Sequence, residues 1–355
     1  MRRGLPEILL FIFVLILLVG IVSILNKPGA QNITSHTQTA WLTKEPETNP
    51  LQIQVMRQKQ YPGSDLVIEQ TLADGSNYHQ YIASYQSEGL KIYGLLTVPI
   101  GEKPKMGWPV IIFNHGYIPP QQYRTTERYV AYVDAFARNG YIVFKPDYRG
   151  NGFSEGQPEG AYYSPSYATD VLNALASLKK FKEADSDKIG MWGHSMGGNI
   201  TLRSLVVNPA DIKAAVIWGG VVGTYDDLMN NWQRKVTYVP PPNELVLRNR
   251  SRAQIIEKFG TTKTNPQFWN SIDSNSYLQD VTTPIQLHAG GADEEVPVDF
   301  SQGLYDRLNI LKKNVEFYIY PGADHNISGN SFNIAIQRSI DFFNKFLKVS
   351  TRTAI

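Results

Sequence analysis

Short apolar runs alternate with helix-like stretches over most of this chain, and this alternation restricts the fold more than any other feature. The runs span 110–113, 141–145, 189–192, 214–218, 284–288 and 315–320. The helix-like stretches between most of them span 126–138, 167–180, 199–206, 302–312 and 334–347. Strands that alternate with amphipathic helices form a mainly parallel sheet with helices on both faces. We therefore expect an α/β protein of this architecture.

Residues 66–99 precede the alternation and read as strands only. LVIEQTL (66–72) and the runs 78–89 and 90–99 are rich in strand-forming residues, and a Ser-Glu-Gly turn joins the last two. Strands joined by so short a turn pair in antiparallel fashion. We expect them to form an antiparallel edge of the sheet.

A long insertion interrupts the alternation at about residues 221–280. It contains Pro240, Pro241 and Pro242 and scattered helical pattern, and it is too long for a regular crossover. We interpret it as a cap over the C-terminal edge of the sheet. Its aromatic side chains either line an apolar pocket or form the core of the cap. They are Trp232, Tyr238, Phe259, Phe268 and Trp269.

The N-terminal residues predict a membrane-directed segment. Residues 8–25, ILLFIFVLILLVGIVSIL, carry no charge and approach the length that a bilayer-spanning helix of about 20 residues needs. Arg2 and Arg3 lie before it, which places the N-terminus in the cytoplasm and the rest of the chain outside. The alternative is a signal peptide cleaved near Ala30. We expect an anchor or signal segment at 1–25, a flexible tether at 26–60 and one folded domain at 61–350.

Composition excludes several classes of function. With 42% hydrophobic and 19% charged residues, the chain resembles a globular protein with a sizeable core. A net charge of +2 without long runs of like charge gives no reason to expect a nucleic-acid partner. The absence of cysteine excludes disulfides, thiolate nucleophiles and cysteine metal sites. Nothing in the sequence sets the oligomeric state.

The pentapeptide Gly193 to Gly197, GHSMG, marks a candidate nucleophile. It follows the apolar run 189–192 and precedes a helical pattern, which is the strand-turn-helix context of a G-x-S-x-G nucleophile elbow. Glycines are needed because the turn is too sharp for side chains at those positions. The turn exposes the hydroxyl of Ser195 above the sheet, and the N–H of Met196 becomes a donor for a developing oxyanion.

A serine hydroxyl needs a base, and the order of residues in such elbows limits the choice. The acid and then the histidine follow the serine, so of six histidines only His288 and His325 qualify. His288 ends an apolar run and precedes the acid candidates, which favours a structural role. His325 lies in a loop directly after the run 315–320, where functional groups gather on parallel sheets. We predict that His325 is the base.

The acid is expected in the loop after the run 284–288. Asp293, Glu294 and Glu295 compete there, and Asp293 comes first after a glycine turn. The two glutamates lead into the next helix and could cap it instead. Asp324 is too close to His325 along the chain and is expected to stabilise the loop. The acidic trio could alternatively bind a metal, but no second ligand cluster accompanies it; we favour Asp293 and expect no metal and no organic cofactor.

Two further loops follow strands. Asn114-His115-Gly116-Tyr117 would turn at Gly116 and aim the N–H of Tyr117 at the serine as a second oxyanion donor, or it is only a tight turn. Residues 147–152, DYRGNG, could be a ligand loop. They lack the register of a dinucleotide site, which favours a structural turn.

Taken together, FNHGY, PDYRGNGFSEG, GHSMGG, GGADEEVP and YPGADHN resemble the catalytic domain of the prolyl oligopeptidase family of serine peptidases and its esterase relatives. The resemblance covers roughly residues 93–347 and implies the α/β-hydrolase fold. It implies catalytic roles for Ser195, Asp293 and His325 and an oxyanion role for Tyr117. The larger peptidases of the family resemble a propeller fused to a hydrolase, whereas here we expect only a tether and a few strands before the hydrolase.

The expected chemistry is acyl transfer on peptide or ester substrates. Ser195 would attack a carbonyl, and His325 would carry the proton to the leaving group. A peptidase is favoured by the resemblance, and a carboxylesterase is the alternative within the same chemistry. A binding module on a retained scaffold is the alternative from another class, although such modules usually lose a member of the triad.

Overall fold

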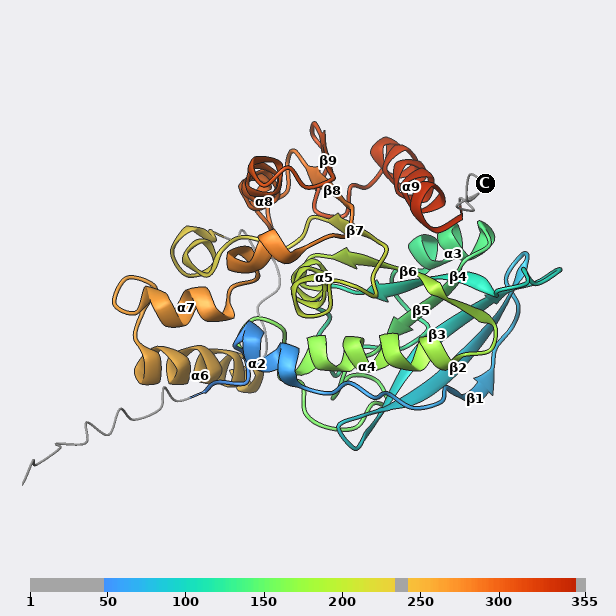
Figure 1. The fold of residues 1–355 in the computed structure, drawn as a ribbon, viewed down its shortest axis with the longest axis horizontal. Helices are drawn as coiled ribbons and strands as arrows, with labels where there is room; N and C mark the ends of the chain where they lie inside the picture. Colours follow the sequence, from blue (N-terminus) through green and yellow to red (C-terminus); the bar gives the residue numbers. More distant parts are fainter. Residues whose placement is uncertain (1–47, 234–241, 349–355) are drawn as a thin grey trace, which may run out of the picture. The chain divides into compact units, whose positions relative to one another are not determined.

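The computed structural model describes residues 48–233 and 242–348. A nine-stranded sheet of order β1-β2-β3-β5-β4-β6-β7-β8-β9 runs through the described domain (Figure 1). The strands are β1 Val67–Thr71, β2 Tyr78–Ser87, β3 Leu90–Pro99, β4 Trp108–Asn114, β5 Ile142–Pro146, β6 Ala184–His194, β7 Ala214–Trp218, β8 Ile285–Gly290 and β9 Val315–Tyr320. β1 to β3 pair in antiparallel fashion and β4 to β9 are parallel to one another. The mainly parallel sheet and its antiparallel edge are confirmed.

Helices follow most of the parallel strands, as expected. They are α2 Ile53–Gln58, α3 Val130–Arg138, α4 Ser166–Lys180, α5 Met196–Val207, α6 Pro242–Phe259, α7 Pro266–Ile272, α8 Val298–Ile310 and α9 Asn330–Phe343. Short irregular helices span Asp227–Asn231, Ser274–Asp280 and Asn344–Lys348.

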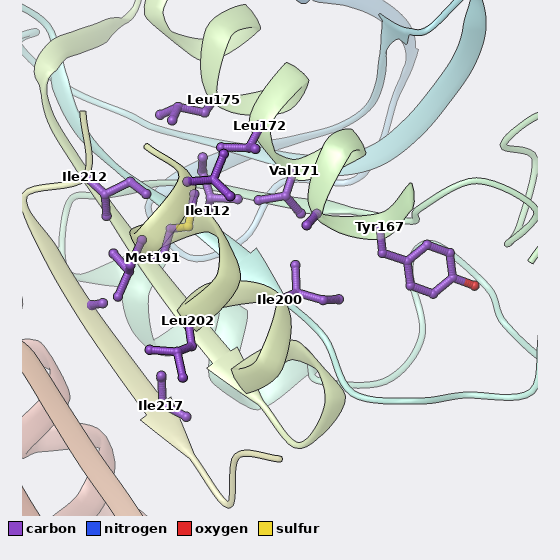
Figure 2. Packing of buried hydrophobic residues seen from close by; sticks show 14 of the residues in the cluster. Ile112, Tyr167, Val171, Leu172, Leu175, Met191, Ile200, Leu202, Ile212 and Ile217 are labelled. Carbon is purple, nitrogen blue, oxygen red and sulfur yellow. The ribbon is translucent and has the colours of Figure 1, made fainter. Parts of the chain in front are cut away.

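The two faces of the sheet carry separate hydrophobic layers. Along β4, Val110 and Ile112 face one layer with α4, α5 and α8, whereas Ile111 and Phe113 face another with α3 and α9. Figure 2 shows side chains of α4 and α5 packed against those of β4, β6 and β7 in the first layer. Strands β4, β5, β7 and β8 are buried on both faces, which explains why they are apolar without alternation.

The expected tether is wrong at its C-terminal end. Residues 51–58 pack into the domain. Leu51 has 1% of its surface exposed, and Ile53, the first residue of α2, has 0% exposed. Arg57 donates to the carbonyl of Val206 at 2.7 Å and pairs with Asp280 at 2.8 Å. The folded domain therefore begins before residue 60, because apolar side chains between the polar Gln residues are buried here.

The expected membrane segment at residues 8–25 lies outside the described residues. Among the helices of residues 48–233 and 242–348, none combines the length and the apolar character that crossing a bilayer requires.

The insertion after β7 is present, and its described part is helical. Trp232 donates to the carbonyl of Glu295, after β8, and Tyr225 donates to the carbonyl of Tyr162, after β5. Both contacts lie beyond the C-terminal ends of strands, which agrees with a cap at that edge. Three of its aromatic residues, Phe259, Phe268 and Trp269, pack with Leu51 in a small hydrophobic cluster, so they form cap core. Tyr238, Pro240 and Pro241 lie outside the described residues.

Candidate active site

Ser195 lies in a sharp turn between β6 and α5. Its backbone has φ 54° and ψ −120°, a conformation that L residues rarely adopt and that costs on the order of 1–3 kcal/mol. The surrounding backbone holds it: the N–H of Ser195 donates to the carbonyl of Trp218 and its carbonyl accepts from Val221, both at 3.0 Å. A side chain at Gly197 would place its Cβ 1.8 Å from the carbonyl oxygen of Asn114. The glycines of the motif thus permit close contact between the elbow and β4.

His325 and Asp293 lie side by side, although 32 positions separate them. Nδ1 of His325 is 2.7 Å from Oδ2 of Asp293, and the side chain of Asp293 is 1% exposed. The other carboxylate oxygen, Oδ1, accepts the N–H groups of Glu295 and Val296 at 2.8 and 2.9 Å. This carboxylate is therefore held on both oxygens, and it orients the imidazole ring through one of them.

Asp293, rather than Glu294 or Glu295, is the carboxylate that contacts His325. Asp324 instead accepts the N–H of Ser328 at 2.8 Å and stabilises its own loop, as expected. No group of His, Asp or Glu side chains in the described part of the chain is arranged to hold a metal ion.

The other ring nitrogen of His325 is buried and, among the described residues, makes no hydrogen bond. Its loop is nevertheless attached to the elbow, because Nε2 of the neighbouring His194 lies 3.0 Å from the carbonyl oxygen of His325. A Cβ on Gly219, which follows β7 with φ 49°, would lie 3.1 Å from Nδ1 of His325. The ends of β6 and β7 thus place Ser195 close to Gly219, which lies against the imidazole ring of His325.

The loop after β4 passes beside the serine. A Cβ on Gly116 would lie 3.1 Å from Cβ of Ser195, so the Gly116-Tyr117 peptide adjoins the nucleophile. Met196 is the first residue of α5, and the first N–H groups of a helix have no acceptor within it. Gly116, which precedes the expected donor Tyr117, therefore lies against Ser195, and the other expected donor, Met196, follows Ser195 directly at the start of α5.

The remaining buried histidines are structural. His288 contacts the hydroxyl of Tyr320 at 2.9 Å and Oε1 of Gln286 at 2.7 Å, and burial lowers its pKa well below the usual value. His115 stacks between Tyr123 and Tyr148, and burial lowers its pKa to about 3. Neither ring contacts the candidate nucleophile through a hydrogen bond.

The DYRGNG segment is a structural turn, as favoured from the sequence. Arg149 pairs with the buried Asp170 at 2.7 Å and with Glu88 at 2.7 Å, which ties the turn to α4 and to the β2–β3 hairpin. Tyr148 and Gly150 both adopt positive φ in it.

Sequence reasoning missed Tyr129. Its hydroxyl lies 2.8 Å from Nδ1 of His194 and accepts the N–H of Gly116 at 2.9 Å. The only signal in the sequence was the position of His194 next to the serine, which brings its ring to the elbow. Nothing in the spacing of Tyr129 indicated its partner.

Comparison with known proteins shows similarity to peptidases. Residues 109–263 match the family model described as serine aminopeptidase, S33. The chain is 24% identical over 248 residues to the uncharacterized peptidase YtmA of Bacillus subtilis, covering 69% of this chain and 85% of that protein. It is 23% identical to a probable dipeptidyl-aminopeptidase B of Aspergillus terreus over 85% of this chain, but spans only 32% of that longer protein.

Solved structures of peptidases and esterases share the fold. The acylaminoacyl peptidase of Pyrococcus horikoshii superposes with a TM-score of 0.61 at 20% identity, over 79% of this chain and 43% of that one. An acetyl xylan esterase from Paenibacillus sp. R4 gives 0.60 at 17% identity, over 83% of this chain and 92% of that one. The chain has the α/β-hydrolase fold, and its similarity to peptidases and esterases supports a serine hydrolase.

Proposed function

We propose that this protein is a serine peptidase of the prolyl oligopeptidase type that works through Ser195, His325 and Asp293. The observation that carries the proposal is the 2.7 Å contact between Nδ1 of His325 and buried Asp293, which leaves Nε2 as the ring nitrogen available to a serine proton. Family resemblance and the match to peptidases support an amide substrate.

The reaction follows from these positions. Oγ of Ser195 attacks the substrate carbonyl carbon while Nε2 of His325 takes the hydroxyl proton. The carbonyl oxygen becomes an oxyanion, which the N–H groups of Met196 and Tyr117 stabilise. His325 then protonates the leaving amine, the C–N bond breaks, and an ester to Ser195 remains. Water, deprotonated by the same nitrogen, hydrolyses that ester and regenerates the serine.

Labelling with a fluorophosphonate tests this mechanism, because the reagent modifies only an activated serine. The full chain, in detergent, is compared with the Ser195→Ala and His325→Ala variants, and mass spectrometry locates the modified residue. We expect modification at Ser195 that both substitutions abolish. A folded protein that is not labelled, or is labelled elsewhere, would refute the proposal.

A carboxylesterase is the second candidate, and one observation favours it. The chain covers 92% of the Paenibacillus esterase, but only 43% of the Pyrococcus peptidase. Rates on short peptide nitroanilides and on small acyl nitrophenyl esters separate the two. Measurable turnover of the peptides supports a peptidase, whereas turnover of esters alone supports the esterase.

We also propose that residues 8–25 anchor the enzyme in a membrane with the catalytic domain on the outer side. An uncharged apolar stretch behind Arg2 and Arg3 supports this orientation. Retention of the chain in the membrane pellet after alkaline extraction, and its digestion by protease added to intact cells, are the expected results. Recovery of a shortened chain in the medium would instead support signal cleavage.

A further inference from the structure

A line of hydrogen bonds joins the loop beside the nucleophile to the loop that carries the histidine. The N–H of Gly116 donates to the hydroxyl of Tyr129 at 2.9 Å. That hydroxyl lies 2.8 Å from Nδ1 of His194, and Nε2 of the same ring lies 3.0 Å from the carbonyl oxygen of His325. Two side chains therefore connect the end of β4, the end of β6 and the loop after β9.

The direction of every bond in this line follows from the chemistry of its ends. A carbonyl oxygen only accepts, so Nε2 of His194 carries the hydrogen. Burial lowers the pKa of His194 to about 3, and the ring is neutral at physiological pH. Its Nδ1 is then an acceptor, the hydroxyl of Tyr129 is the donor to it, and the phenolic oxygen accepts from Gly116.

Tyr129 reaches this position through a strained backbone that other residues hold. Arg128 and Tyr129 both have positive φ, 59° and 54°, an unfavourable conformation for side-chain-bearing residues. The fully buried Lys145 donates to the carbonyl of Glu127 at 3.1 Å. Strain of this kind persists only where the surroundings determine the conformation, and it is common at functional sites.

The loop after β9 has a second contact, with helix α3. Tyr132, on α3, donates to the carbonyl of Asn326 at 2.9 Å. The ring of His194 also lies against that of His325, with 4.5 Å between the ring centres. The main chain of His325 and of the next residue is thus held by side chains from β6 and α3.

We propose that Tyr129 and His194 are positioning residues that set the geometry of the oxyanion donor at Tyr117 and of the base at His325. The inference rests on the proposed serine-hydrolase mechanism. Tyr129 fixes the peptide before Tyr117 through Gly116, and His194 fixes the main chain of His325. Neither residue touches the reacting atoms. The transition state needs the N–H of Tyr117 and the imidazole of His325 in their correct positions, so loss of either positioning residue should affect the transition state more than substrate binding.

The first test is Tyr129→Phe, with Tyr78→Phe as the matched control. Tyr78 also donates its hydroxyl to α3, to Asp134 at 2.9 Å, and plays no part in the site. The second-order rate constant of fluorophosphonate labelling is measured beside kcat and KM for the better substrate class. We expect Tyr129→Phe to lower the labelling rate constant and kcat by about 10- to 100-fold, with KM within about threefold of wild type. The control is expected to stay within about twofold of wild type.

The second test asks whether the side chains of Tyr129 and His194 are energetically coupled. We expect His194→Phe to lower kcat by a similar factor, and the double variant to be little slower than the worse single variant, because residues in one network are not additive. His194→Gln retains an N–H for the carbonyl of His325 and is expected to recover part of the loss.

Three outcomes overturn the inference. They are unchanged rate constants in both single variants, a loss confined to KM, and losses that multiply in the double variant. Failure of the wild type to label at Ser195 would refute the mechanism itself, and the inference with it. Normal wild-type labelling with normal variants refutes the inference alone.

Discussion

Replacing Asp293 with Asn isolates the contribution of the acid, because both carboxylate oxygens of Asp293 have hydrogen-bond partners and an amide has only one oxygen to replace them. Oδ1 accepts two backbone N–H groups, from Glu295 and Val296, so the oxygen of an amide stays there. The NH₂ group then faces Nδ1 of His325, where Oδ2 now lies at 2.7 Å. A donor at that place makes Nδ1 an acceptor and moves the ring hydrogen to Nε2.

A histidine with its hydrogen on Nε2 cannot take the proton of Ser195. The substitution keeps the shape of the site and reverses the tautomer, and in an analogous triad the same change lowers kcat by about 10⁴-fold. At about 1.4 kcal/mol per factor of ten, this corresponds to about 5 kcal/mol of lost transition-state stabilisation. We expect kcat to fall by about four orders of magnitude while KM changes little.

The assay is steady-state kinetics on the better substrate class, beside the rate of fluorophosphonate labelling and a thermal melt. Asp324→Asn is the control, since that carboxylate neighbours His325 in sequence and only accepts the N–H of Ser328. If Asp293→Asn retained activity within tenfold of wild type while Glu295→Gln lost it, the assignment of the acid would be wrong.

Three further predictions concern the oxyanion loop, the buried histidines and helix α2. Gly116→Ala would place a Cβ 2.5 Å from the hydroxyl of Tyr129, so labelling of Ser195 should slow by at least about tenfold in a folded protein. The buried neutral histidines have folded-state pKa values below their unfolded values, so the stability they contribute is present above about pH 6.5 and is lost as pH falls. They are His115, His194 and His288. Urea denaturation should show the unfolding free energy falling by several kcal/mol from pH 7 to 5.5, at about 1.4 kcal/mol per pH unit for each ring; a flat profile would contradict their burial as neutral groups. Ile53→Ala should lower the unfolding free energy by about 2–5 kcal/mol, because this fully buried side chain ties α2 to the domain, and an unchanged denaturation midpoint would show that α2 is dispensable.

Much of the fold could be predicted from the sequence because burial on both faces gives the parallel strands an unmistakable composition. The run 214–218 coincides with β7, in which every residue is buried. The run 315–320 coincides with β9, which lies at the edge of the sheet and is only partly buried. Helix α2 could not be predicted in this way. Its six residues carry only two buried side chains, Ile53 and Met56, between polar neighbours, and its stability comes from contacts with residues more than 140 positions away.

The candidate site was predictable to the extent that chain order limits it. Order and loop position selected Ser195, Asp293 and His325, and the structure brings the last two into contact. Order and loop position favoured Asp293 over the two adjacent glutamates, but which of the three side chains points towards the imidazole depends on the folded loop. The role of Tyr129 could not be predicted, because its position depends on the strained backbone of Arg128 and Tyr129, which Lys145 on β5 holds.

The site is built from residues at the ends of the parallel strands and from a contact between the cap and the acid loop. Ser195, Gly116 and His325 lie at the ends of parallel strands, where Tyr129 holds the N–H of Gly116 and His194 holds the carbonyl of His325. The insertion contributes to these contacts through its first residue, Val221, whose N–H donates to the carbonyl of Ser195. The cap also meets the acid loop through Trp232, which donates to Glu295 and packs against Tyr162 and Phe300. Changes in Trp232 should therefore alter KM and the choice between peptide and ester substrates, while the rate of labelling by a small fluorophosphonate stays near that of wild type. Equal losses in labelling and in turnover would instead mean that the cap helps to hold Asp293 against His325, through the same loop.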